Sequence, residues 1–233
     1  VTLTVGTGIG NILSLSSVTG TASGSSSNLT INTTGAATIS GAVGTDIGTV
    51  TVTQSGGTTF SSTVDAATVT LTDTADASNI TFSDNVTLTT GLTVSAGTAA
   101  YNVVFNGASN TIAGATTFSN TGSVTLGNES TDSITFTGGI TATAPSQVNI
   151  AGTVQTTDNA ISIGDSNTPT VLTANTTISS GTAGLTLGGS VNGAFTFTPT
   201  RSVKLIEITP SGAIAIDYQV SVAPEGKNTL HLV

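Results

Sequence analysis

The sequence contains no cysteine, no methionine and no tryptophan, and only 4% of its 233 residues are aromatic. Without cysteine the chain can form neither disulfide bonds nor thiolate metal sites. Charged residues make up 6% of the chain, whereas an average soluble domain has about 25%. No apolar run reaches the roughly 18 residues that a membrane-spanning helix needs, so we expect no transmembrane segment.

Basic residues are almost absent. The chain has three, Arg201, Lys204 and Lys227, against 12 acidic residues, which gives a net charge of -9. Residues 1–200 therefore contain neither lysine nor arginine. Proteins that bind nucleic acids or anionic membranes need a basic surface, so we expect no nucleic-acid partner.

One short phrase recurs throughout the sequence. It consists of an apolar residue, a threonine and a second apolar residue. Each copy predicts a minimal strand with one apolar and one hydroxyl face, and turns rich in Gly, Ser, Asn and Ala separate the copies. Such internal repetition is typical of a β-solenoid. The copies are Leu3-Thr4-Val5, Leu29-Thr30-Ile31, Val50-Thr51-Val52, Val69-Thr70-Leu71, Ile80-Thr81-Phe82, Val86-Thr87-Leu88, Leu92-Thr93-Val94, Val124-Thr125-Leu126, Ile134-Thr135-Phe136, Leu185-Thr186-Leu187 and Phe195-Thr196-Phe197.

Elementary geometry favours a stack of parallel rungs. Strands of three to five residues are too short for stable hairpins, but rungs about 4.8 Å apart can pair with the rungs on both sides. The period is close to twenty residues and drifts, so residues 1–200 predict about ten coils and a rod about 50 Å long. Threonine is expected to face outward. The positions predicted to face inward include Val50, Val52, Val69, Leu71, Ile80, Phe82, Val124, Leu126, Ile134, Phe136, Leu185 and Leu187.

Two longer phrases recur. Thr58-Thr59-Phe60-Ser61 returns 58 positions later as Thr116-Thr117-Phe118-Ser119, a separation that suggests three coils. A second phrase places glycine two residues after an inward apolar residue, where a corner with unusual backbone angles is expected. Its copies are Ile39-Ser40-Gly41-Ala42-Val43, Ile112-Ala113-Gly114-Ala115 and Ile150-Ala151-Gly152-Thr153-Val154.

Residues 201–233 differ from residues 1–200 and predict a separate C-terminal antiparallel β module, a cap or an assembly junction. This segment holds all the basic residues and a long alternating strand between turn-rich segments. Because the chain stops inside an apparent strand, we expect strand addition to a neighbouring subunit, with an arbitrary chain boundary as the alternative. The residues expected to serve assembly are Ile214, Ile216, Tyr218, Val220, Val222, Leu230 and Leu232.

The repeat pattern of residues 1–200 resembles the β-strand repeats of filamentous haemagglutinins and autotransporter passengers. The resemblance implies a right-handed parallel β-helix, secretion, and a role in adhesion or surface structure. The chain starts at Val1 without a signal peptide, so we expect an export signal outside it. The residues that carry the resemblance are 134–140, 144–154 and 185–195.

Acidic side chains offer the only candidates for metal or enzyme chemistry. Asp73, Asp76 and Asp84 form the densest acidic stretch and are candidates for a calcium site, because Ca²⁺ prefers oxygen ligands. The single histidine, His231, lies near the chain end and is expected to face outward on a terminal strand, so we expect no serine triad. A carbohydrate-active β-helix enzyme with a carboxylate pair stays open as an alternative function. The other acids of residues 1–200 are Asp46, Asp65, Glu129, Asp132, Asp158 and Asp165.

The outward side chains bear on two kinds of surface recognition. Thr-x-Thr pairs such as Thr49-Val50-Thr51 suggest ice binding, but that function needs strict stacking on one face, and the drifting period argues against it. Sugar recognition usually uses exposed aromatics. Only Tyr101 and Tyr218 have a polar group, and the seven phenylalanines sit in inward positions, so no lectin site is visible.

These observations favour a non-enzymatic extracellular building block. We expect a rod-like segment of a bacterial adhesin, surface filament or surface layer, located outside the cell or on its surface. The expected partners are further copies or the continuation of a longer polypeptide, and a host or surface glycan. No cofactor is expected.

Overall fold

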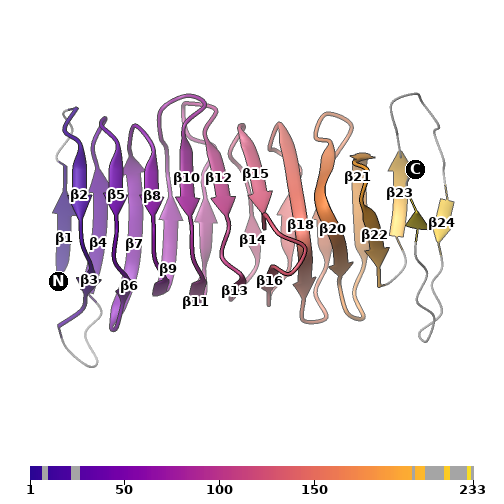
Figure 1. Cartoon of the computed structure of the whole chain (residues 1–233), viewed down its shortest axis with the longest axis horizontal. Helices are drawn as coiled ribbons and strands as arrows, with labels where there is room; N and C mark the ends of the chain where they lie inside the picture. Colours follow the sequence, from indigo (N-terminus) through magenta and orange to yellow (C-terminus); the bar gives the residue numbers. More distant parts are fainter. Residues whose placement is uncertain (7–9, 22–26, 201–202, 208–217, 221–229, 232–233) are drawn as a thin grey trace.

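A parallel β-solenoid of about nine turns forms most of the described structure, and a few antiparallel strands follow at its C-terminal end (Figure 1). The computed structural model describes residues 1–6, 10–21, 27–200, 203–207, 218–220 and 230–231, and beyond residue 200 it describes the backbone alone. Every regular element in these ranges is a β-strand, so the described part holds no helix that could span a bilayer. The all-β fold and the parallel stacking are as predicted.

The strands form three parallel ladders, which we call faces 1, 2 and 3. Face 1 contains β1 (Thr2–Val5), β4 (Ser27–Asn32), β7 (Ile47–Gln54), the second halves of β9 (Val64–Leu71) and β11 (Val86–Val94), β14 (Thr116–Thr117), β17 (Ile140–Ala142), β19 (Ile161–Ile163), the first half of β21 (Leu185–Asn192) and β23 (Val203–Glu207).

Faces 2 and 3 complete each coil. Face 2 contains β2 (Leu13–Leu15), β5 (Ala37–Ile39), β8 (Thr58–Phe60), β10 (Asn79–Phe82), β12 (Asn102–Phe105), β15 (Ser123–Leu126), the first halves of β18 (Gln147–Thr156) and β20 (Thr170–Ser179), and the end of β21. Face 3 contains β3 (Val18–Thr19), β6 (Val43–Gly44), the first halves of β9 and β11, β13 (Ser109–Ile112), β16 (Ser133–Phe136), the second halves of β18 and β20, and β22 (Thr196–Pro199).

Coil length varies, and the corners absorb the variation. Hydrogen bonds between adjacent rungs join residues 19 positions apart at Ser55 and Thr74, and 26 positions apart at Asn28 and Thr2. Most coils are thus longer than the expected twenty residues, which explains about nine turns instead of about ten.

Glycine is required where the predicted corner phrase turns. Gly152 has φ 70° and Gly114 has φ 71°, a region that other residues rarely adopt. A Cβ on Gly152 would collide with the carbonyl oxygen of Asp132 in the preceding coil. Gly41 has no positive φ, but a Cβ there would meet the carbonyl oxygen of Ser16. Corner glycines are therefore needed for two reasons: some have a positive φ, and others lie too close to a backbone carbonyl of the neighbouring coil for a Cβ to fit.

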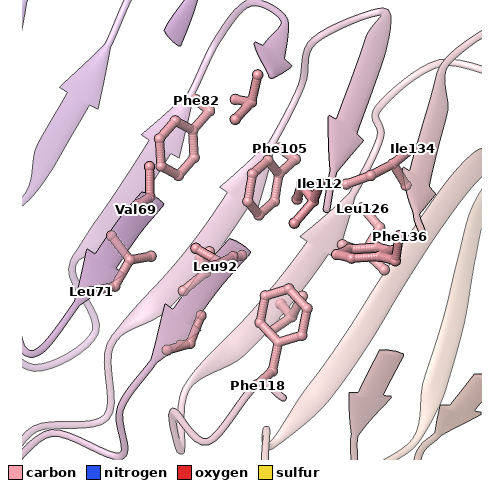
Figure 2. Packing of buried hydrophobic residues seen from close by; sticks show 14 of the residues in the cluster. Val69, Leu71, Phe82, Leu92, Phe105, Ile112, Phe118, Leu126, Ile134 and Phe136 are labelled. Atoms are coloured by element: carbon pink, nitrogen blue, oxygen red, sulfur yellow. The ribbon is translucent and has the colours of Figure 1, made fainter. Parts of the chain in front are cut away.

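The interior follows the predicted period-two alternation. Each of the twelve residues predicted to face inward is at most 2% exposed, and the threonine between each pair is half-buried on the outside. Face 2 also stacks Phe60, Phe82 and Phe105 (Figure 2 shows the last two), with ring centroids 5.0 and 4.8 Å apart. These separations match the strand spacing of about 4.8 Å, so the backbone ladder sets the aromatic stacking.

Two expectations from the sequence were wrong. Phe195 is 39% exposed, because it lies in the bend before β22 rather than within the strand. The 58-residue repeat does not correspond to whole coils: Phe60 pairs with Phe82 on face 2, whereas Phe118 is bridged to Val94 on face 1. The three faces share one chemical pattern, so similar phrases can occur on different faces.

The last described strands change direction. β23 still pairs in parallel with β21, so the parallel ladder of face 1 extends past residue 200. β24 (Tyr218–Val220) then pairs antiparallel with β23, and β25 (Leu230–His231) pairs antiparallel with β22. A few antiparallel strands at this end agree with the prediction, while the domain boundary at residue 200 stays a prediction.

Paired substitutions at neighbouring positions test the inward and outward assignment. Leu126 is fully buried between Phe105 and Ile150 on adjacent rungs. Leu126→Asp places an unpaired charge there and should destabilise the fold by at least about 3 kcal/mol. Thr125→Ser keeps the hydroxyl that accepts a hydrogen bond from Asn149 and should cost less than about 1 kcal/mol. Thermal melting measures both, and equal shifts would contradict the register.

Candidate functional site

A continuous column of hydroxyl side chains runs along the outside of face 1. We call it the threonine ladder, and it consists of Thr4, Thr30, Thr51, Thr70, Thr93, Thr117, Thr141, Ser162 and Thr186.

Strand register places these residues side by side. Direct backbone pairing links Thr4 through Thr93 in one run and Thr117 through Thr186 in a second. Between the runs, the bridge from Val94 to Phe118 keeps the same register one residue further along. All nine side chains are exposed or half-buried, so the ladder is accessible over its whole length.

A second column widens the surface near its middle. Thr49 and Thr68 are paired across adjacent rungs, two residues before Thr51 and Thr70, and therefore point to the same side of the sheet. Gly91 continues this second column next to Thr93. The middle of face 1 thus has hydroxyls repeating in two directions.

The equivalent outward columns of the other faces are less uniform. On face 2 the hydroxyl run Ser14, Thr38, Thr59 and Thr81 is broken at Val104. On face 3 the corresponding column includes Asp65 and Gln155. Among the described faces, only face 1 has a hydroxyl at every rung of its central outward column from Thr4 to Thr186.

The expectation that drift in the period prevents threonine stacking was wrong. Drift changes the corner loops, whereas pairing of the backbone fixes each threonine opposite the next. The signal was present in the sequence: six copies of the apolar–Thr–apolar phrase fall on face 1, and aligning the chain on that phrase instead of a fixed period would have found the ladder. The six begin at Leu3, Leu29, Val50, Val69, Leu92 and Leu185.

Asp73 lies at the corner between faces 1 and 2, beside a shallow open depression. Its Oδ2 accepts hydrogen bonds from the Thr98 hydroxyl at 2.5 Å and the Thr98 amide at 3.1 Å. Its Oδ1 accepts from the amides of Thr74 at 3.0 Å and Ala99 at 3.3 Å. The carboxylate therefore joins two successive coils. The depression is lined by Thr34, Gln54, Ser55, Asp73, Thr74, Ala75, Thr98 and Ala99.

Electrostatics at this corner affects two groups. Partial burial acts to raise the pKa of Asp73, but the hydrogen bonds from Thr98, Ala99 and Thr74 outweigh it and lower the pKa below its ordinary value of 3.8. Burial, followed by the nearby Asp73 charge, raises the pKa of Tyr101. Its hydroxyl donates to the carbonyl oxygen of Ser95 at 2.6 Å. Tyr101 is fully buried, so it supports the corner and offers no aromatic surface to a sugar.

The three predicted calcium candidates occupy two corners. Asp73 and Asp76 lie between β9 and β10, and Asp76 accepts a hydrogen bond from the Ala100 amide at 3.2 Å. Asp84 lies between β10 and β11 and accepts from the Asn85 amide at 2.7 Å. Across the described residues, no three acidic or histidine side chains group as metal ligands would. Calcium binding stays a prediction.

Other acids also lie at corners, where they bind backbone amides. Asp132 accepts from the amides of Asn128 and Glu129, each at 2.9 Å. Asp158 accepts from the Thr182 amide in the next coil at 2.7 Å, and Asp165 accepts from Asn167 at 2.8 Å. These contacts give the acids a structural role, and the carboxylate-pair mechanism stays untested.

The predicted assembly residues are only partly covered. Tyr218 and Val220 lie on β24 opposite Leu205 and Val203, and Leu230 lies on β25 opposite Phe197. Ile214, Ile216, Val222 and Leu232 lie outside the described residues. Their role in assembly stays a prediction.

Comparison of the chain with family models, curated proteins and solved structures gave no match. The β-solenoid fold is consistent with the predicted resemblance to haemagglutinin and autotransporter repeats, while membership of either family stays a prediction.

Acid titration tests the corner at Asp73. Because its folded-state pKa is lowered, ionised Asp73 stabilises the fold above its unfolded pKa of about 4, and that stabilisation is lost as pH falls through the lower, folded pKa. Asp73→Asn should lower the melting temperature at neutral pH and reduce the further loss on acidification. Thr98→Ala, which removes one of the four donors, should give a smaller effect in the same direction. Identical acid profiles in all three proteins would contradict this role.

Proposed function

We propose that the chain is a non-enzymatic structural segment of a bacterial extracellular protein, forming a stiff rod in an adhesin, surface filament or surface layer. The observation that carries this proposal is the three-sided stack of parallel rungs, which is about nine turns long. At about 4.8 Å per rung, nine turns give a rod about 43 Å long.

Packing and surface chemistry support a mechanical role. The inside is a single apolar cluster that extends from Leu29 to Phe197, so each coil is held by the coils beside it. The outside is dominated by short hydroxyl side chains with little charge, which resist collapse without attracting ionic partners. The acids whose contacts are described accept hydrogen bonds from backbone amides at the corners, and these contacts stabilise the corners.

The C-terminal strands support an assembly or capping role. A solenoid end presents unpaired backbone groups, which is an aggregation hazard. Here β24 and β25 pair antiparallel with the last strands of faces 1 and 3. We propose that residues 201–233 close the stack and join it to a further copy or to more of the same polypeptide.

Proteolysis tests the rod. A stacked ladder leaves few segments able to open locally, so native proteinase K digestion should leave a large core within residues 1–200. Mass spectrometry of the products measures this, and the same digestion in denaturant is the control. Rapid native conversion to small peptides would contradict a continuous rod.

Turnover distinguishes the rod from the enzyme alternative. The intact chain is incubated with a panel of polysaccharides, and release of reducing ends is measured. A structural segment should release none above a heat-denatured control. Robust turnover would overturn the proposed function and favour a carbohydrate-active β-helix enzyme.

Deletion of residues 201–233 tests the junction. Light scattering of the full and shortened chains measures assembly, and circular dichroism measures folding. Loss of oligomers with a folded monomer supports a junction, whereas unfolding or aggregation marks the segment as a cap. Unchanged folding and assembly would refute both roles.

A further inference from the structure

The threonine ladder is a regular array rather than a collection of outward threonines. Across the rungs its members are about 4.8 Å apart, and along a strand Thr49 and Thr51 are separated by about 6.8 Å, twice the rise per residue. Thr68 and Thr70 repeat the same pair on the next rung. Over these two rungs the ladder widens into a small two-dimensional lattice of hydroxyl and methyl groups, and on the next rung Gly91 takes the place of the second threonine.

The hydroxyls of this lattice are free to bind something outside the protein. Within the described part of the chain, none of the nine ladder side chains makes a hydrogen bond to another protein group. Two outward threonines on the other faces are engaged by neighbouring side chains: Thr125 accepts from Asn149 at 3.2 Å on face 2, and Thr135 accepts from Gln155 at 3.0 Å on face 3. Face 1 therefore keeps its hydrogen-bonding capacity for solvent or a ligand.

The lattice is also rigid. Threonine is β-branched and has few side-chain rotamers, and each ladder residue stands on a strand paired with its neighbours. Ordering costs on binding are therefore small. A rigid array favours a partner that is itself periodic and rigid over a flexible polymer.

Surface chemistry narrows the class of partner. The ladder from Thr4 to Thr186 contains no charged residue, which disfavours a mineral or an anionic surface. It contains no aromatic side chain, which disfavours stacking on sugar rings. Each hydroxyl both donates and accepts hydrogen bonds, as a water molecule does, and the methyl groups fill the space between them.

We propose that face 1 binds ice. The hydroxyl spacings in the two directions are close to the oxygen repeats on a face of hexagonal ice, so ladder hydroxyls can occupy or anchor lattice water positions while the methyl groups pack into the spaces between them. The widest part of the array, Thr49, Thr51, Thr68 and Thr70 with Thr93, is the centre of the binding surface. This inference is independent of the rod function.

Ice recrystallisation and thermal hysteresis measure the binding directly. The whole chain should slow recrystallisation and shape growing ice crystals. Thr51→Lys and Thr70→Lys each put a long charged side chain at the centre of the array without entering the core, and each should lose most of the activity. Thr59→Lys is the matched control, because Thr59 is an outward, half-buried threonine between Thr38 and Thr81 on face 2.

The outcomes separate cleanly. Full activity in Thr59→Lys with loss in both face 1 variants, and with all melting temperatures near that of the parent, supports the proposal. An inactive parent chain overturns it, as does equal loss in the face 1 and face 2 variants. If a lysine variant melts at a lower temperature than the parent, Thr70→Ser provides a folded variant, because it removes only the methyl group. This variant should show intermediate activity. Parent-like activity in it would count against the methyl contacts.

Discussion

Backbone pairing between successive rungs is the interaction on which the rest of this structure depends. Each short strand is too small to be stable alone, and it gains stability only because the coils on both sides complete its hydrogen bonds. The pairing also fixes register, and register decides which side chains meet. The stack of Phe60, Phe82 and Phe105 at 4.8–5.0 Å and the threonine ladder outside are two results of the same spacing.

The corners show how a variable chain keeps a constant register. Loops differ in length from coil to coil, yet side chains at the corners bind the neighbouring coil. Ser55 and Thr74 share a hydrogen bond of 2.6 Å in the interior, and Asn102 bonds to Asn79 on one side and to the Ser123 amide on the other. The Ser55–Thr74 contact satisfies two buried hydroxyls, and together these contacts allow length changes without a shift of the strands.

The outer surface follows from the same constraint. Once strands are held in register, a residue type repeated at one position of each coil becomes a column. On face 1 that residue is a threonine or serine at every rung from Thr4 to Thr186, and Lys204 takes the position on the next rung, β23. The stacked solenoid thus also presents an uncharged periodic surface from Thr4 to Thr186, and the stacking and the surface pattern have one physical origin.

The sequence by itself determined the local pattern. Alternation of apolar and hydroxyl residues identified the inward positions, because in a strand the side chains point alternately to opposite sides. Only the tertiary structure decided which strands share a face. Phe60 and Phe118 have nearly identical neighbours in sequence but lie on different faces, because the faces are chemically alike and the coil length varies. For the same reason the partners of Asp73, 25 and 26 residues away, and the alignment of the threonine ladder emerge only when each coil is placed on the next.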